Sequence, residues 1–126
     1  MRLANVAVKV ADVHAASPTI DHLTGLEIAA CHELNDRAFL EVHAGDTVIN
    51  VFDRLLYESS DGRPVDPGFA HISCFIEDLG RALADPGWSS CLIWGPEEIA
   101  GGFGRRRIAF FEVAPGVRIE LIEDLS

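Results

Sequence analysis

The sequence is poor in cysteine and has no long apolar run. Its three cysteines, Cys31, Cys74 and Cys91, are odd in number and widely spaced, so they indicate neither a disulfide framework nor a cysteine-based zinc site. No apolar run approaches the roughly 18 residues of a membrane span, and the N-terminus has no signal-peptide pattern. We therefore expect a globular protein of the reducing cytoplasm that has no membrane partner.

Basic residues are also scarce. Ten lysines and arginines stand against twenty aspartates and glutamates, which gives a formal net charge of −10. Nucleic-acid phosphates require a basic protein surface, so this charge argues against a nucleic-acid partner. It is compatible with a cationic ligand, but negative charge of this size commonly serves only to keep a small protein in solution.

The chain contains an internal sequence repeat. Residues 5–13 resemble residues 71–79, and residues 44–53 resemble residues 114–123 at a slightly larger offset. Repetition at such a period indicates a duplicated module. Each copy places one polar residue on its first predicted strand and one on its last, and these four residues are Asn5, Asn50, His71 and Glu120.

The apolar periodicity predicts the order βαβββ in each copy. We expect strands at residues 3–10, 26–30, 38–43 and 47–52 of the first copy, and at 70–76, 90–94, 106–113 and 117–122 of the second. Asp12 or Ser17 is a suitable N-cap for a helix that ends at Gly25, and a second helix is expected at residues 79–83. Turns are expected at residues 35–36 and 45–46.

Two stretches are rich in glycine and proline. Residues 58–68 separate the copies, which predicts a first module at residues 1–57, a linker at 58–68 and a second module at 69–126 within one compact domain. Residues 95–104 interrupt the second copy, and their glycines suggest a mobile loop that closes over a ligand.

Three parts of the second copy resemble the vicinal-oxygen-chelate superfamily, which includes glyoxalase I, methylmalonyl-CoA epimerase, extradiol dioxygenases and bleomycin-resistance proteins. They are residues 70–78, the Gly-Pro pair at 95–96, and residues 107–121. The resemblance implies an α+β fold, in which tandem βαβββ modules form a cupped mixed sheet around a shared cavity. It also implies a homodimer.

By the same resemblance, the cavity is lined by the first and last strands of both modules, and metal-using members carry His, Glu or Gln at those positions. This chain has His71 and Glu120, but Asn5 and Asn50 occupy the other two positions. A divalent metal prefers imidazole and carboxylate ligands to neutral amides. We therefore expect no cofactor, with a divalent metal on the incomplete set of His71 and Glu120 as the alternative.

Without a metal, a carboxylate beside an imidazole suits the removal of a proton next to a carbonyl group. His71 and Glu120 are then the predicted catalytic pair, and the amides of Asn5 and Asn50 would bind the developing enolate oxygen. The structural alternative is a histidine and a carboxylate paired only for stability. Strand alternation further predicts three aromatic cavity residues, namely Phe52, Phe75 and Phe111.

Arg105, Arg106 and Arg107 allow two interpretations. Guanidinium groups match carboxylates and phosphates, so the triplet is a candidate anchor for an anionic group of a substrate. The alternative, which composition favours, is a set of exposed charges at a strand end. The remaining histidines, at positions 14, 22, 32 and 43, lack metal-ligand spacing and are expected at the surface.

Two classes of function are consistent with these residues. The first is a protein of the bleomycin-resistance type that sequesters or acts on a small organic ligand, such as a natural product, without a standard metal site. The second is an isomerase or lyase of the epimerase and glyoxalase type, which uses His71 and Glu120 for proton transfer or metal binding. The two Asn residues favour the first class, and the His/Glu pair favours the second.

Overall fold

The computed structural model describes residues 1–34, 37–58 and 64–126. Its elements in chain order are β1 (Arg2–Lys9), α1 (Val13–Thr24), β2 (Glu27–Leu34), β3 (Arg37–Ala44), β4 (Thr47–Phe52), β5 (Gly68–Ile76), α3 (Leu79–Leu83), α4 (Pro86–Ser89), β6 (Leu92–Gly101), β7 (Gly104–Ala114) and β8 (Val117–Asp124). The turn predicted at residues 35–36 and residues 59–63 of the predicted linker lie outside the described part of the chain. Within that part, no helix has the length and apolarity to cross a membrane.

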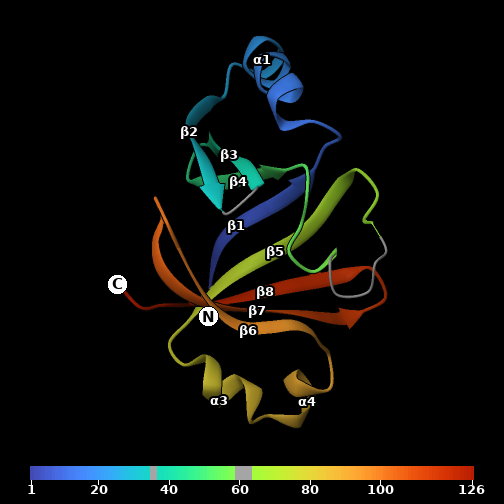
Figure 1. Ribbon diagram of the computed structural model, residues 1–126, viewed down its shortest axis with the longest axis vertical. Coiled ribbons are helices and arrows are strands. Elements are labelled where there is room, and N and C mark those ends of the chain that lie inside the picture. The colour runs from blue at the N-terminus through green and yellow to red at the C-terminus, as the bar shows by residue number, and fades with distance from the viewer. Residues whose placement is uncertain (35–36, 59–63) are drawn as a thin grey trace.

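The eight strands form one sheet in the order β2-β3-β4-β1-β5-β8-β7-β6. β1 pairs with β4 and β5 pairs with β8 in parallel, so each half of the sheet has the same internal order. The halves join where β1 and β5 run antiparallel. The sheet curls, with α1 at one end of the molecule and α3 and α4 at the other (Figure 1). The predicted fold, an α+β cupped mixed sheet of two βαβββ modules, is confirmed.

The helices cover the outer face of the sheet. α1 begins at Asp12, whose carboxylate accepts hydrogen bonds from two backbone N–H groups of the first turn, and it ends at Gly25 in the left-handed conformation (φ 65°). Asp12 was one of the two N-caps that the sequence predicted, and Gly25 was the predicted end of the helix. Buried residues under α1 are Val13, Leu40, Val42 and Val51, and those around α3 and α4 are Leu79, Ala109, Phe111 and Leu121.

The glycine-rich residues 95–104 are not the mobile loop predicted from composition. β6 continues through Gly101 and pairs with β7 down to Gly101 and Gly104. Two of the glycines allow an unusual backbone conformation instead, because Gly95 and Gly104 have φ values of 89° and 98°, which other residues rarely adopt. The prediction was therefore wrong, and the stretch is a strand that ends in a tight turn bearing Phe103.

Candidate functional site

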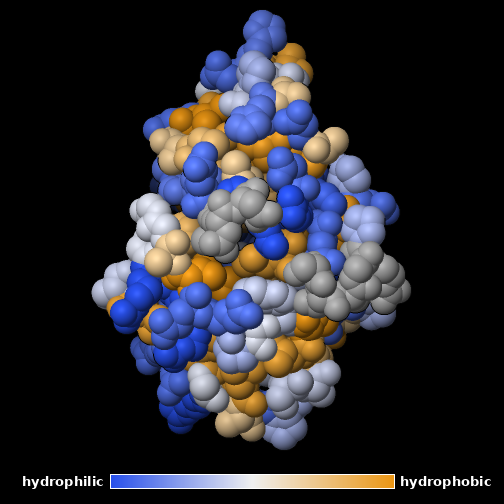
Figure 2. Space-filling model, in the orientation of Figure 1, coloured by the Kyte–Doolittle hydropathy of each residue, from blue (hydrophilic) through white to orange (hydrophobic). Residues whose placement is uncertain are grey.

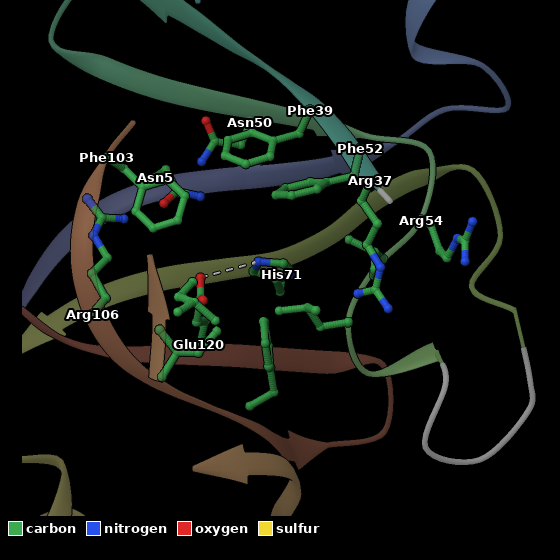
Figure 3. Close-up of a pocket in the computed structure, with 15 residues that line it drawn as sticks. Asn5, Arg37, Phe39, Asn50, Phe52, Arg54, His71, Phe103, Arg106 and Glu120 are labelled. Carbon is green, nitrogen blue, oxygen red and sulfur yellow. Dashed lines mark ion pairs between the residues drawn. The ribbon is translucent and has the colours of Figure 1, made fainter. Parts of the chain in front are cut away.

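A cavity opens on the concave face between the two halves of the sheet. It encloses about 580 Å³ of empty space, including its open mouth. The four residues matched between the sequence copies all line it, and Figure 3 shows them converging from β1, β4, β5 and β8. In the space-filling view, hydrophilic and apolar surface meet near the middle of this face (Figure 2).

The strand register explains this convergence. On β1, Asn5 and Ala7 share one face, and Ala7 pairs with both Asn50 on β4 and His71 on β5. On the other side of β5, Ser73 pairs with Glu120 on β8. Directly paired residues share a face of the sheet. The four matched polar side chains, one from each central strand, therefore all point into the cavity.

His71 is held by the phenol of Tyr57. The Tyr57 hydroxyl lies 3.0 Å from His71 Nδ1 and 3.4 Å from the carbonyl oxygen of Ala70. Burial raises the pKa of Tyr57, so the phenol keeps its proton and is available to donate it. Phe110 packs edge-on against the imidazole at 5.0 Å between ring centroids. These contacts fix the ring and leave His71 Nε2 facing Glu120.

Glu120 is held from its other side. The Ser73 hydroxyl donates a hydrogen bond to Glu120 Oε1 at 2.5 Å. His71 Nε2 lies 3.7 Å from the same oxygen, which is an ion-pair distance but too long for a hydrogen bond. With exposed fractions of 2% for His71 and 9% for Glu120, the two groups form a shielded acid/base pair that is fixed from both ends.

Asn5 and Asn50 face the same cavity. Among the residues that the structure describes, neither side-chain amide has a hydrogen-bond partner. An amide has two donor hydrogens and one acceptor oxygen, so these side chains can bind polar groups of a molecule in the cavity. Asn5 is 5% exposed, and a polar group buried to this degree favours a partner.

Of the three aromatic residues that were predicted to line the cavity, one lines it, one lines an adjoining recess and one lies on the opposite face of the sheet. Phe52 lines the cavity and stacks on Phe39 at 4.7 Å, and Phe75 lines an adjoining recess. The prediction for Phe111 was wrong, because this ring is buried under α4 against Trp88, on the opposite face. Its neighbour Phe110 pairs with Glu120 and lines the cavity instead.

Three arginines line the cavity, and the sequence did not indicate that they would lie together. Arg37 begins β3, Arg54 follows β4 and Arg106 lies on β7. The members of the arginine triplet Arg105, Arg106 and Arg107 have different positions. Arg106 lies on the cavity face, whereas Arg105 is exposed and Arg107 forms ion pairs with Glu98 and Glu123. Strand alternation separates Arg106 from its neighbours, but only the register shows which face is the inner one.

The donor set does not fit a divalent metal. It provides one imidazole and one carboxylate, with two amides in place of further strong ligands, and Tyr57 and Ser73 already engage the imidazole and the carboxylate. Across the described part of the chain, no group of three or more His, Cys, Asp or Glu side chains could hold a metal ion. The arginines around the same cavity add positive charge, which opposes a cation.

Comparison with solved structures identifies the fold. Methylmalonyl-CoA epimerase from Mycobacterium tuberculosis superposes with a TM-score of 0.67 at 27% identity, over 99% of this chain and 89% of that one. A variant of the Streptomyces coelicolor epimerase, bound to 2-nitronate-propionyl-CoA, gives 0.67 at 19% identity over 100% and 99%. A glyoxalase/bleomycin resistance protein/dioxygenase superfamily member from Vibrio splendidus gives 0.66 at 10% identity over 96% and 97%.

The chain therefore has the vicinal-oxygen-chelate fold, as the sequence resemblance predicted. Epimerases and a glyoxalase/bleomycin-resistance type protein both stand among its structural neighbours. No protein-family model and no curated protein matches the sequence.

Proposed function

We propose that this chain binds a small organic molecule in the cavity between its two modules and does so without a standard divalent-metal site. The observation that carries the proposal is the composition of the cavity wall. Two amides without side-chain partners among the described residues face an aromatic wall and a buried His/Glu pair. A concave, largely apolar site with a few convergent polar groups is typical of small-molecule binding.

A second candidate function is proton transfer next to a carbonyl group, as in an isomerase or lyase. It is favoured by the fixed geometry of His71 and Glu120, which lie 3.7 Å apart and are each held from outside by a hydroxyl group. A general base needs such positioning within reach of the substrate proton. In this candidate, His71 Nε2 or Glu120 takes the proton, and the amides of Asn5 and Asn50 stabilise the enolate oxygen.

The chain offers a direct test of binding. It contains no glutamine and three asparagines, so the side-chain amide region of its nitrogen-proton NMR spectrum holds three NH2 pairs, from Asn5, Asn35 and Asn50. Two of the three line the cavity. We expect fragments from a library of neutral, cationic and anionic compounds to shift the Asn5 and Asn50 signals, which Asn5→Ser and Asn50→Ser would assign.

Binding outside the cavity, or no binding by any fragment, would contradict the proposal. A substitution control strengthens the result. Phe52→Ala truncates a cavity ring and should weaken fragment binding several-fold, whereas Phe69→Ala removes a ring that is 52% exposed and should leave binding unchanged.

The same samples separate the two candidate functions. One structural neighbour is methylmalonyl-CoA epimerase in complex with methylmalonyl-CoA, so this thioester is a suitable probe. In heavy water with chelator present, a proton-transfer enzyme would exchange the proton between its two carbonyl groups faster than buffer alone. Glu120→Gln should then abolish the exchange and preserve binding. Binding without exchange would support sequestration.

A further inference from the structure

Most of the charged residues that line the cavity are arginines, although the protein as a whole is acidic. Three of the ten basic residues, Arg37, Arg54 and Arg106, line it, and Glu120 is the one acidic residue among its described lining residues. The charge of Glu120 is partly engaged within the wall, since Ser73 donates a hydrogen bond to it. The charged side chains that line the cavity are therefore mostly positive, although the chain as a whole carries a formal net charge of −10.

Arg106 is held in an unusual way. Its guanidinium carbon lies 5.2 Å from the ring centre of Phe75 and 5.0 Å from that of Phe103, which are cation–π distances. The faces of these rings attract the positive charge of the guanidinium, but they do not serve as ordinary hydrogen-bond acceptors for its N–H groups. Arg106 Nε is buried without a hydrogen-bond partner, and within the described part of the chain Arg106 forms no ion pair.

One acidic residue beside Arg106 is Asp124, which pairs with it across β7 and β8. Its carboxylate is exposed and accepts a hydrogen bond from the backbone N–H of Ser126 at 3.0 Å. The charges of Arg106 and Asp124 attract each other, but this attraction is solvent-screened. Within the described part of the chain, Arg106 therefore lines the cavity with guanidinium donor capacity that no protein group uses.

A carboxylate matches these donors. Its two coplanar oxygens accept two parallel hydrogen bonds from one guanidinium edge, an arrangement that a neutral amide or an amine cannot reproduce. Contact with two aromatic rings restricts the guanidinium before a ligand binds and so lowers the entropy cost of binding. Beside it, the stacked rings of Phe39 and Phe52 offer an apolar wall to the body of a ligand.

We infer that the ligand of this cavity is a small organic carboxylate with an apolar, ring-bearing body, and that Arg106 recognises its carboxylate. The inference rests on the proposed function, because it names the chemical class of that ligand. Arg106 reaches the cavity from one side, while Arg37 and Arg54 lie on the other (Figure 3).

The test compares acids with their neutral isosteres. The probes are benzoate, phenylacetate and 3-phenylpropionate with their three primary amides, titrated against the Asn5 and Asn50 side-chain signals. We expect at least one acid to bind at least tenfold more tightly than its amide. Arg106→Gln should abolish this preference, and Arg106→Lys should retain part of it, because a point charge remains but the fork is lost.

Arg105→Gln is the matched control, since it makes the same change in net charge one residue away at an exposed position. It should leave the acid preference intact, and each variant must retain the wild-type spectrum and thermal midpoint. Three results would overturn the inference: amides that bind as tightly as acids, equal losses in Arg105→Gln and Arg106→Gln, or no acid that binds. If neutral fragments still bind in the cavity, the proposed function stands and only the ligand class is wrong.

Discussion

At the scale of single residues, Tyr57 of the first module contacts residues of the second module. It lies just after the first module's last strand, yet its hydroxyl contacts His71 on β5 and its ring packs edge-on against Phe110 on β7. Burial raises the pKa of Tyr57 above its ordinary value of 10.0. The phenolate form is therefore disfavoured in the folded state.

This shift predicts an alkaline limit to stability. The folded-state pKa lies above the unfolded one, so the contribution of Tyr57 is complete below about pH 10 and is lost as the pH rises through the folded-state pKa. Tyr57 is the only tyrosine, so ultraviolet absorbance of tyrosinate reports it alone. We expect this absorbance to appear together with loss of circular dichroism.

The urea-unfolded chain should titrate near pH 10 in the same experiment, and Tyr57→Phe should give no tyrosinate signal. A tyrosinate transition near pH 10 in protein that is still folded would contradict the predicted burial effect.

At the scale of elements, a carboxylate joins the edge strand to the rest of the first module. Glu41 on β3 lies 2.8 Å from His32 Nε2 on β2 and 2.6 Å from His43 Nε2. His32 in turn stacks on Phe39 and meets the ring of Phe103 at 6.0 Å. The β6–β7 turn thereby contacts the opposite module across the cavity. His32 and His43 were predicted as surface positions. The structure shows both partly buried beside Glu41, with 12% of the His32 side chain and 36% of the His43 side chain exposed.

The hydrogen bond from His32, followed by that from His43, holds the pKa of Glu41 below its ordinary value of 4.5. A lowered folded-state pKa means that the stabilisation is complete above about pH 4.5 and is lost as the pH falls through the folded-state pKa. We expect Glu41→Gln to reduce the free energy of unfolding by about 1 kcal/mol near neutral pH.

The difference from wild type should shrink as the pH falls below 4.5 and the Glu41 carboxylate of the wild type takes up a proton. Urea unfolding at neutral and at acidic pH measures it. Glu33→Gln on β2 makes the same charge change at an exposed position and should have little effect. An equal loss in both variants, or a loss in Glu41→Gln that persists at low pH, would count against this assignment.

At the scale of the whole molecule, the two modules share one core beneath the cavity. Its buried residues are Ala7, Leu55, Tyr57, Ala70, Ile108, Phe110 and Ile122. Three of these come from the first module and four from the second. Because neither module can bury this surface alone, we expect the chain to unfold in a single cooperative transition.

Both tryptophans, Trp88 and Trp94, belong to the second module, whereas far-ultraviolet circular dichroism reports both modules. The two signals should coincide in urea. Leu55→Ala in the first module should lower the midpoint of the tryptophan transition, with a loss of roughly 2–5 kcal/mol for a buried leucine. Leu23→Ala, at a position that is 75% exposed, is the control. Separate transitions for the two signals would show that the modules are independent.

The sequence by itself determined the repeated βαβββ pattern, because strand alternation, caps and turn residues act over a few neighbouring positions. It also selected Asn5, Asn50, His71 and Glu120, since matched positions in duplicated modules occupy matched places in the sheet. It failed at residues 95–104, where glycines that suggested a loop instead permit a bent strand. It also failed at Phe111, whose face depends on the pairing between β7 and β8.

Only the tertiary structure decided which side chains share the cavity with those four. Register fixes the inner face of each strand, and register depends on long-range pairing rather than on local periodicity. This is why only the structure shows that Arg106, rather than Arg105 and Arg107, faces the cavity, and that Tyr57 contacts His71. The charge of the chain is a sum over all residues, but the charge of the cavity depends on the few that the sheet turns inward.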